Sequence, residues 1–376
     1  MRVLITGGAG FIGSHTADLL LDGGHEVRVF DNLDPQIHGS GRQWPTWMDK
    51  SVETIFGDMR DKTALVRALT NIEVVFHLAA ATGVGQSMYQ ISKYFEVNVQ
   101  GTAYLLDILA NEPHQVRKLI LASSRAIYGE GAYRCQHCGI VSPDQRPAAQ
   151  IDTKQWEVTC PHCSSPVTPS PTPESKMPKP ASMYAISKLT QEQMCLCFGE
   201  AYDLPVVALR YFNVYGPRQS FTNPYTGIIT VFLSRLFNGR APEVYEDGQM
   251  TRDFVHVSDV VRANLLAMER EGADGQVINI GTGIATSIHT LAELLCEMVS
   301  PDLRPQVIGV ARVGDIRHCT ADLGLTKARL GYEPRVFLEQ GLRSVIQDAQ
   351  QQKKIEDTSA IARQELTKSG LLRSRG

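Results

Sequence analysis

The chain has 376 residues, and its 37 basic and 40 acidic side chains leave a formal net charge of -3 at pH 7. This length favours one large domain with a second lobe, and the charge balance gives no reason to expect a nucleic-acid or membrane-surface binder. No apolar run reaches the roughly 18 residues of a membrane span, and the apolar N-terminus lacks the basic region and cleavage site of a signal peptide. We therefore expect a cytoplasmic protein that binds neither nucleic acid nor membranes.

Short apolar segments alternate along the chain with stretches of helical periodicity, which is the pattern of a parallel sheet covered by helices on both faces. The sequence predicts strands at 3–6, 27–31, 53–56, 74–78, 118–123, 206–211 and 277–281. It predicts helices at 14–22, 62–69, 98–110 and 181–201. The expected fold is α/β, a Rossmann-type doubly wound parallel sheet.

The first predicted strand leads into the glycine-rich turn Gly7-Gly8-Ala9-Gly10-Phe11-Ile12-Gly13, and the second ends at Asp31. Glycine suits this turn because the backbone takes positive φ and comes close to a pyrophosphate, which the N–H groups of the next helix bind. An acid after the second strand accepts hydrogen bonds from the adenosine ribose and repels a 2′-phosphate. The order of these elements predicts an NAD site and disfavours NADP.

Other predicted strands place further candidates at the same edge of the sheet, because ligands bind beyond the carboxyl ends of parallel strands. The candidates for one extended dinucleotide groove are Gly7, Gly10, Phe11, Ile12, Gly13, Asp31, Asn32, Asp58, Met59, Leu78, Ala79 and Ala80. His77 ends an apolar strand without an acid or nucleophile beside it, so we interpret it as a packed structural histidine.

Tyr184 and Lys188 lie four residues apart in the predicted helix 181–201. This spacing puts both on one face, where the ammonium can stabilise a phenolate and lower the tyrosine pKa from about 10 toward working pH. By itself the pair is typical of an exposed helical surface. Beside a dinucleotide site it predicts Tyr184 as the general acid/base, and Lys188 as the group that lowers the tyrosine pKa and holds the nicotinamide ribose. Ser124, which follows strand 118–123, is expected to hydrogen-bond the substrate.

The chain resembles the extended short-chain dehydrogenase/reductase superfamily, and more narrowly its NAD-dependent nucleotide-sugar epimerases and dehydratases. The resemblance covers about residues 1–130 and 172–345 and rests on TGGAGFIGS at 6–14, HLAA at 77–80, NVQGT at 98–102, SSRAIYG at 123–129, YAISK at 184–188 and RYFNVYGPRQ at 210–219. It implies a catalytic set of Ser124, Tyr184 and Lys188 and a homodimer formed through two sheet-covering helices. It adds Asn98, Ala122, Tyr184, Lys188 and Tyr211 to the expected NAD contacts.

A nucleotide diphosphate is the ligand that the resemblance implies for the second lobe. The implied substrate contacts are Ser124, Arg125, Asn213, Ile229 in the 223–229 loop, Tyr245, Arg252, Arg312 and Asp315. Arg252 and Arg312 lie in segments bounded by turn residues, where they could clamp a diphosphate or stand as solvated surface arginines. Asp315 could contact a ribose or base, or it could cap its own loop.

Three parts of the chain follow from these assignments. We expect an NAD-binding domain over 1–210 with an insert at 131–172, and a smaller nucleotide-sugar lobe over 211–345 whose strand 277–281 returns to the sheet. The residues from 346 to 376 are expected to form a polar tail, a frayed helix with disorder.

The residues after Ser124 bear on the reaction. In the dehydratases that the chain resembles an acid pair stands there, and in the decarboxylases a glutamate, whereas this chain has Arg125 and Ala126. Without an acid to protonate a leaving hydroxyl, elimination of water is disfavoured. The resemblance then implies a C4 epimerase that works through a transient 4-keto sugar with tightly bound NAD. A nucleotide-sugar 4-dehydrogenase or reductase is the alternative enzyme, and an NAD-binding interaction protein is the alternative without catalysis.

The identity of the sugar depends on weaker features. Arg125 could meet the C5 carboxylate of a glucuronate, or it could point away as an ordinary packed arginine, which we favour. The stretch DNLDPQIHG at 31–39 and the cysteine-bearing insert are similar to the dTDP-L-rhamnose 4-epimerases of this family. A dTDP-6-deoxyhexose such as dTDP-L-rhamnose is therefore the expected substrate, with UDP-glucose or UDP-glucuronate as the alternative.

The insert carries two C-x2-C pairs, Cys135 with Cys138 and Cys160 with Cys163. Their spacing predicts a zinc ribbon, and four thiolate ligands close the coordination shell, so the metal would be structural. A disulfide or redox pair is the alternative. Because the insert stands between Ser124 and Tyr184 in the chain, we expect it near the mouth of the site as a lid, a dimer contact or a substrate-selective wall.

Overall fold

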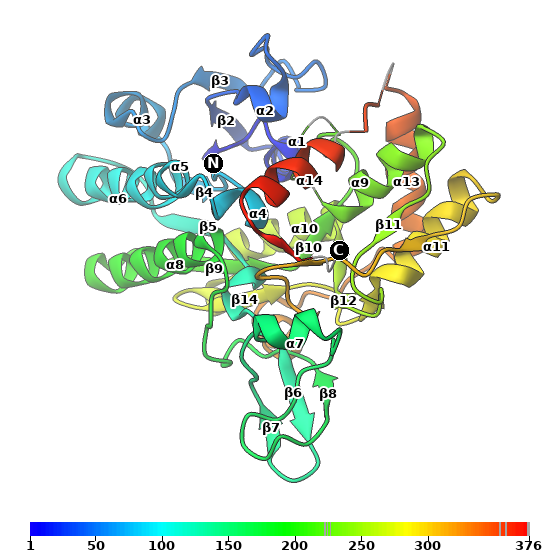
Figure 1. Cartoon of the computed structure of the whole chain (residues 1–376). Helices are drawn as coiled ribbons and strands as arrows, with labels where there is room; N and C mark the ends of the chain where they lie inside the picture. Colours follow the sequence, from blue (N-terminus) through cyan, green and yellow to red (C-terminus); the bar gives the residue numbers. More distant parts are fainter. Residues whose placement is uncertain (222, 224, 226, 353–354, 358, 374–376) are drawn as a thin grey trace.

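The computed structural model describes residues 1–221, 223, 225, 227–352, 355–357 and 359–373 (Figure 1). Its strands are β1 Arg2–Thr6, β2 Glu26–Asp31, β3 Glu53–Phe56, β4 Val74–His77, β5 Lys118–Ser124, β6 Ala132–Cys135, β7 Gly139–Val141, β8 Val167–Ser170, β9 Val206–Tyr211, β10 Asn213–Tyr215, β11 Glu243–Val244, β12 Thr251–Arg252, β13 Phe254–His256, β14 Val277–Ile280, β15 Thr286–Ser287, β16 Gln306–Val307, β17 Ala311–Arg312, β18 His318–Cys319 and β19 Leu372–Arg373.

The α-helices are α1 Phe11–Asp22, α2 Pro35–His38, α3 Lys62–Leu69, α4 Val84–Ser87, α5 Ile91–Tyr94, α6 Gly101–Asn111, α7 Ala148–Asp152, α8 Met183–Tyr202, α9 Ile228–Phe237, α10 Val257–Glu269, α11 Ile288–Val299, α12 Gly324–Leu330, α13 Leu338–Gln350 and α14 Ser359–Lys368. A π-helical turn, Phe95–Gln100, precedes α6, and 3-10 turns span Arg125–Tyr128 and Glu271–Ala273. Among the described residues, no helix combines the length and apolar character needed to cross a bilayer.

A seven-stranded sheet forms the centre of the molecule, with the strand order β14-β9-β5-β4-β1-β2-β3. Every pair of neighbouring strands in it is parallel. All seven strands predicted from the sequence are present, and the predicted α/β doubly wound fold is confirmed. Because the strands are parallel, their carboxyl ends meet at one edge, where the glycine turn, Asp31 and Ser124 come together.

Helices cover both faces of this sheet because successive strand residues point to opposite sides. In β1, Val3 and Ile5 pack in a core that also holds residues of α1 and α10, whereas Leu4 packs with residues of α3, α6 and α8. Helix α10 belongs to the segment 211–345 that we assigned to the second lobe. It nevertheless packs on the sheet beside α1, so the expected boundary at residue 210 does not separate two independent cores.

The second lobe has a core of its own, in which Leu233 of α9, Leu291 of α11 and Leu342 of α13 are fully buried. Small sheets link its segments, including β12 between β15 and β18. These pairings bring the segments around Arg252 and Cys319 side by side.

The insert forms a small antiparallel sheet in which β6 lies between β7 and β8. It extends away from the main body with α7 beside it (Figure 1). The Pro-rich segment 166–180 closes the insert, and its first part, Val167–Ser170, pairs with β6. The insert is therefore closed at both ends by its own strand pairing.

The segment after residue 345 differs from the expected polar tail. Its first residues complete α13, and helix α14 returns to lie against the region of α4 (Figure 1). Leu366 of α14 is only 4% exposed, and β19 pairs antiparallel with β17. For residues 359–373 the expectation of a frayed, disordered tail was wrong, because one buried leucine and a strand pair fix the segment to the body.

Candidate functional site

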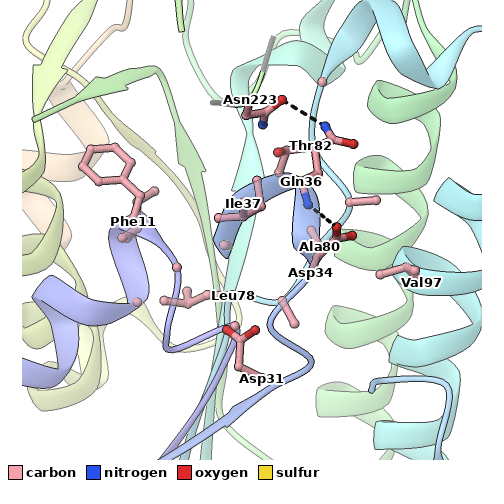
Figure 2. Close-up of a pocket in the computed structure, with 18 of the residues that line it drawn as sticks. Phe11, Asp31, Asp34, Gln36, Ile37, Leu78, Ala80, Thr82, Val97 and Asn223 are labelled. Atoms are coloured by element: carbon pink, nitrogen blue, oxygen red, sulfur yellow. Dashed lines mark hydrogen bonds between the residues drawn. The ribbon is translucent and has the colours of Figure 1, made fainter. Parts of the chain in front are cut away.

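A cavity of about 430 Å³ runs along the carboxyl edge of the central sheet. The residues predicted to contact NAD line it, with the exception of Asn98. Figure 2 shows Asp31 and Asn223 at opposite ends of the view, with Leu78 and Ala80 between them. The strand–turn–helix pattern of the sequence therefore correctly predicted that these residues share one groove.

The glycine turn is packed so closely that no larger residue fits at Gly7 or Gly13. Gly7 has a φ of +71°, and a Cβ there would lie 2.8 Å from the Cα of Ala79. A Cβ on Gly13 would lie 2.3 Å from the carbonyl oxygen of Gly7. Helix α1 begins directly after this turn, and no side chain caps its N-terminus at Gly10. Its first N–H groups and its dipole therefore form a site for an anionic group.

Asp31 stands at the end of β2 with 8% of its surface exposed. Its carboxylate accepts hydrogen bonds from the backbone N–H of Ala9 at 3.0 Å and of Leu33 at 2.9 Å. Burial raises the pKa of Asp31, and the two backbone bonds act in the opposite direction. The glycine turn and the acid are thus joined directly, as a ribose-binding carboxylate beside a pyrophosphate turn requires.

Asn98 was predicted to contact NAD, but its side chain is engaged elsewhere. Its amide accepts a hydrogen bond from the N–H of Ala81 at 2.7 Å and donates to the carbonyl of Ala81 at 3.1 Å and to the hydroxyl of Ser187 at 2.9 Å. The side chain is fully buried and does not line the cavity. Asn98 therefore holds the loop after β4 against helix α8, and it stabilises the groove without lining it.

His77 is a structural residue, as its sequence context predicted. One ring nitrogen lies 2.8 Å from the hydroxyl of Thr6 and the other 2.9 Å from that of Thr102. Complete burial lowers the pKa of His77 to about 3, so the ring is neutral. The neutral ring, hydrogen-bonded at both nitrogens, links β1, β4 and α6. It takes no part in proton transfer near neutral pH.

Ser124 ends β5, and its hydroxyl group is close enough to Tyr184 to oppose the rise that burial causes in the pKa of the phenol. Ser124 also accepts a bond from the N–H of Ala126 at 3.1 Å, and Ser182 caps the start of α8 by accepting from the N–H of Ala185. The cap fixes the helix start one residue before Tyr184. Ser124 and Tyr184 therefore lie at the same end of the central sheet.

Lys188 lies one turn after Tyr184, but its ammonium donates to the side chain of Gln191 at 2.8 Å. Burial raises the pKa of Tyr184, and the groups that oppose this effect are Ser124 and Arg125. The expected lowering of the phenol pKa by Lys188 is therefore not what this geometry shows. Lys188 itself is buried, which lowers its pKa to about 8.

Arg125 follows Ser124 directly in the chain. Its guanidinium acts electrostatically on Tyr184, on Arg252 and on Asp315. It is therefore close enough to influence both the Tyr184 hydroxyl group and the residues expected at the diphosphate.

The residues expected at the diphosphate converge on one carboxylate. Arg312 donates to Asp315 at 2.7 Å, and a guanidinium nitrogen of Arg252 lies 4.0 Å from the same oxygen. Arg252 also donates to the carbonyls of Ile316 at 2.8 Å and Arg317 at 3.1 Å. Burial lowers the pKa of Arg252 to about 10, yet it stays a cation at neutral pH. Two arginines held in this way can bind a diphosphate with charge-assisted hydrogen bonds.

Two buried polar atoms of this region have no hydrogen-bond partner among the described residues, Oδ1 of Asn213 and Nε of Arg312. Such atoms fit a ligand with complementary polar groups. Tyr245 is partly buried, and Arg312 acts electrostatically on its phenol. Ile229 is different, because it is 2% exposed and belongs to the core of the second lobe. Its predicted role in substrate binding was wrong for the side chain.

Some residues of the site had no local sequence signal. Gln36 of α2 lines the cavity and donates to Asn223 at 2.9 Å, although the two are far apart in the chain. Glu365 of α14 accepts hydrogen bonds from Tyr89, at 2.7 Å, and from Tyr225. Only the return of the C-terminal segment brings Glu365 to Tyr225, which lines the cavity, and a pattern within one stretch of sequence cannot show it.

The four cysteines of the insert lie together. The Sγ atoms of Cys135, Cys138, Cys160 and Cys163 are all within 4.8 Å of one another, and those of Cys135 and Cys163 are 3.5 Å apart. All four are free thiols, two buried and two exposed. In a tetrahedral zinc site with four thiolates the sulfur atoms are about 3.8 Å apart, so the donor set and its spacing fit this metal.

Comparisons with known proteins agree with this site. The model of the NAD dependent epimerase/dehydratase family matches residues 3–147 and 158–281, leaving a gap inside the insert. The chain is 38% identical to a dTDP-L-rhamnose 4-epimerase of Burkholderia thailandensis, over 91% of this chain and 93% of the relative.

Solved structures give the same picture. A UDP-glucose 4-epimerase of Thermotoga maritima, solved with UDP-glucose, is 34% identical with a TM-score of 0.74, over 93% of this chain and 99% of that chain. The protein MoeE5 in complex with UDP-glucuronic acid and NAD is 32% identical with a TM-score of 0.74 and the same coverage.

Proposed function

Because the chain belongs to the NAD-dependent epimerase/dehydratase family, we propose that it is an isomerase that inverts C4 of a nucleotide-diphosphate sugar. The observation that carries this proposal is the proximity of Ser124 to Tyr184, whose side chain lines the dinucleotide groove. The two positions after Ser124 hold Arg125 and Ala126. Neither can protonate a leaving hydroxyl group, which supports epimerisation over dehydration.

The groove suits NAD. The start of α1 has no side-chain cap, so its N–H groups can bind a pyrophosphate, and Asp31 offers its carboxylate to ribose hydroxyl groups. When bound there, NAD supplies a hydride acceptor for C4 that also returns the hydride. The negative charge of Asp31 disfavours the 2′-phosphate of NADP.

The side chains then divide the work of proton transfer and orientation. Tyr184 takes the proton of the C4 hydroxyl group and later gives it back, while Ser124 holds the same oxygen by a hydrogen bond. Arg125 acts electrostatically on the phenol and favours the phenolate. Lys188 is placed one helical turn away, where it can hold the nicotinamide ribose.

Epimerisation also requires that the hexose present both faces of C4. Arg252 and Arg312, which converge on Asp315, can hold the diphosphate while the sugar turns. Anchoring the nucleotide away from the reacting carbon leaves the hexose free to rotate between the two hydride transfers. The intermediate in this scheme is a 4-keto sugar that never leaves the site.

A dTDP-6-deoxyhexose such as dTDP-L-rhamnose is the substrate that we propose, and the relative from Burkholderia thailandensis supports it. A second candidate is UDP-glucuronate. It is favoured by Arg125, a cation that acts electrostatically on both Tyr184 and Asp315 and could pair with a C5 carboxylate. MoeE5, solved with UDP-glucuronic acid, supports this alternative.

One experiment tests the reaction. Purified protein is incubated with dTDP-L-rhamnose, UDP-glucuronate or UDP-glucose without added cofactor, and products are identified by NMR. The expected result is conversion of one sugar to its C4 epimer, with NAD released only on denaturation. Steady reduction of external NAD, or oxidation of external NADH, would instead identify a net dehydrogenase or reductase and overturn the proposal.

For the insert we propose a structural zinc ion bound by Cys135, Cys138, Cys160 and Cys163, as the clustering of their sulfur atoms supports. We also propose a cytoplasmic location, where thiols stay reduced and available to a metal. Metal analysis should give one zinc per chain, and replacing Cys135 and Cys160 by serine should remove it. The control is Cys197→Ser, because Cys197 is an exposed cysteine outside the cluster. A metal-free protein with oxidised cysteines would contradict the proposal.

A homodimer is the assembly that we propose, through two helices that cover the sheet. Helices α6 and α8 cover the same face, and the stacked rings of Phe198 and Tyr202 lie near the end of α8. Tyr202 is 58% exposed, so an apolar ring is available to a partner. Analytical ultracentrifugation should give twice the mass of the chain, and a monomer at micromolar concentration would contradict this.

A further inference from the structure

A cluster of charged side chains, buried at its centre, joins the cysteine insert to the second lobe. It consists of Arg146 and Glu157 from the insert with Glu246, Asp247 and Arg317 from the lobe, and we call it the insert cluster. The side chains of Arg146, Glu246 and Arg317 are each 1% exposed. Charges so deeply buried are found where they are paired and hydrogen-bonded, so their geometry is informative.

Glu246 is the centre of the insert cluster. Arg146 donates two hydrogen bonds of 2.8 Å to its two carboxylate oxygens, and Arg317 donates a third at 3.0 Å. Arg317 also donates hydrogen bonds of 2.7 and 2.8 Å to the carboxylate of Asp247, and it donates to the carboxylate of Glu157. The paired bonds from Arg146 fix both the distance and the plane of the Glu246 carboxylate.

Asp315 connects this cluster to the candidate diphosphate site. Its carbonyl oxygen accepts a hydrogen bond of 3.2 Å from Arg146, and its carboxylate accepts one of 2.7 Å from Arg312. The next two carbonyls, of Ile316 and Arg317, hold the guanidinium of Arg252. The insert therefore touches the backbone of the same loop whose side chains converge on the diphosphate site.

A second loop of the site is held by the same charges. Glu246 has a φ of +51°, a conformation that a residue with a side chain adopts only when its surroundings stabilise it. Here the two arginines supply that stabilisation. Tyr245, a predicted substrate contact, is the preceding residue, so its position depends on this turn.

We propose that Arg146 is a positioning residue, through which the insert aligns the loops 245–247 and 312–317 around the nucleoside diphosphate. The inference rests on the proposed function, and it gives the insert a role in substrate binding in place of a lid or wall. Only an arginine reaches Glu246 with two bonds and the Asp315 carbonyl with a third contact. Removing it leaves Glu246 with one arginine and frees the loop.

The test compares Arg146→Gln with Asp144→Asn, a control in the same segment whose ion pair with Lys179 is exposed. Calorimetry measures binding of dTDP and of UDP alone, and released NAD is quantified for each protein. We expect the dissociation constant of the preferred nucleotide and the KM of its sugar to rise at least about tenfold in Arg146→Gln, because misplaced loops lose oriented contacts. NAD content and kcat should change less than about threefold, since the NAD groove lies in the other lobe.

Three outcomes are distinguishable. If the natural protein binds neither dTDP nor UDP, the proposed function fails and the inference fails with it. If the natural protein binds one of them and Arg146→Gln binds it equally well, only the inference is overturned. Should Arg146→Gln fail to fold, Arg146→Lys decides, because it keeps the charge but loses the paired bonds. Arg146→Lys should also raise the dissociation constant of the nucleotide, and an unchanged dissociation constant would overturn the inference.

Discussion

Lys188 donates a hydrogen bond of 2.8 Å to the side chain of Gln191, within helix α8. Burial lowers the pKa of Lys188 to about 8, so its charge is lost as the pH rises through that value. We expect kcat to fall above pH 8, because the ammonium no longer holds its partners. Gln191→Met, which removes the acceptor, should move this fall to lower pH, whereas Gln193→Met on the exposed face should not. A flat profile of kcat between pH 7 and 10 would contradict the assignment.

Tyr184→Phe should lower kcat by about 10²- to 10⁴-fold, because the reaction loses its general acid/base. KM and NAD content should stay close to those of the natural protein, since the ring remains in place. Steady-state kinetics with the preferred sugar gives the measurement. Tyr202→Phe, the same change on an exposed tyrosine of the same helix, should be without effect. Full activity of Tyr184→Phe would exclude the proposed mechanism.

Asp31→Asn should weaken NAD binding and reduce the discrimination against NADP. The amide keeps one acceptor for the N–H of Ala9 or Leu33 but no longer repels a 2′-phosphate. The ratio of the dissociation constants for NAD and NADP, measured on protein stripped of cofactor, checks this. Asp22→Asn, at the exposed end of α1, serves as the control. An unchanged ratio would show that Asp31 does not face the ribose.

Glu192→Gln should destabilise the protein by about 3–5 kcal/mol, because it leaves a buried arginine charge without its partner. Glu192 accepts bonds from Arg210 at 2.6 and 3.0 Å and from Ser123 at 2.6 Å. The urea midpoint of unfolding measures the loss. Glu200→Gln, exposed on the same helix, should leave the midpoint unchanged. Equal midpoints for the two variants would mean that the buried pair adds nothing to stability.

Leu366→Ala should release the C-terminal segment without unfolding the body. The side chain is 4% exposed and would come within 3.0 Å of a Cβ at Gly85, so truncation leaves a cavity under α14. Limited proteolysis should then cut after residue 352 faster than in the natural protein. Ile361→Ala, on the exposed face of the same helix, is the matched control. Equal cleavage of both variants would show that Leu366 does not hold the segment.

Most of the sheet and the NAD groove could be predicted because their signals are local. The strand, the glycine turn and α1 need particular backbone angles and close approaches within a few residues, and glycine at positions 7 and 13 encodes them. Asp31 follows at the end of the next strand, which pairs with the first. The C-x2-C pairs are local in the same sense, because each forms its own tight turn.

Other residues were misjudged because their roles depend on partners distant in the chain. Asn98 belongs to a sequence motif typical of the family, from which a contact to NAD was expected. Its three hydrogen bonds go instead to the loop after β4 and to α8. The charges that Arg125 acts on, Arg252 and Asp315, are distant in the chain, so its own segment could not show them. Ile229 is apolar, and only the packing of α9 decided that it belongs to a core.

The sequence by itself thus determined the cofactor groove, the pair of hydroxyl groups at its end and the grouping of the cysteines. The tertiary structure alone decided how the insert meets the substrate lobe, through Arg146, Glu246 and the Asp315 carbonyl. The physical reason is the range of the interactions. Turns and helix spacings are fixed by neighbours in the chain, whereas a buried ion pair forms only when folding brings distant residues together and excludes water between them.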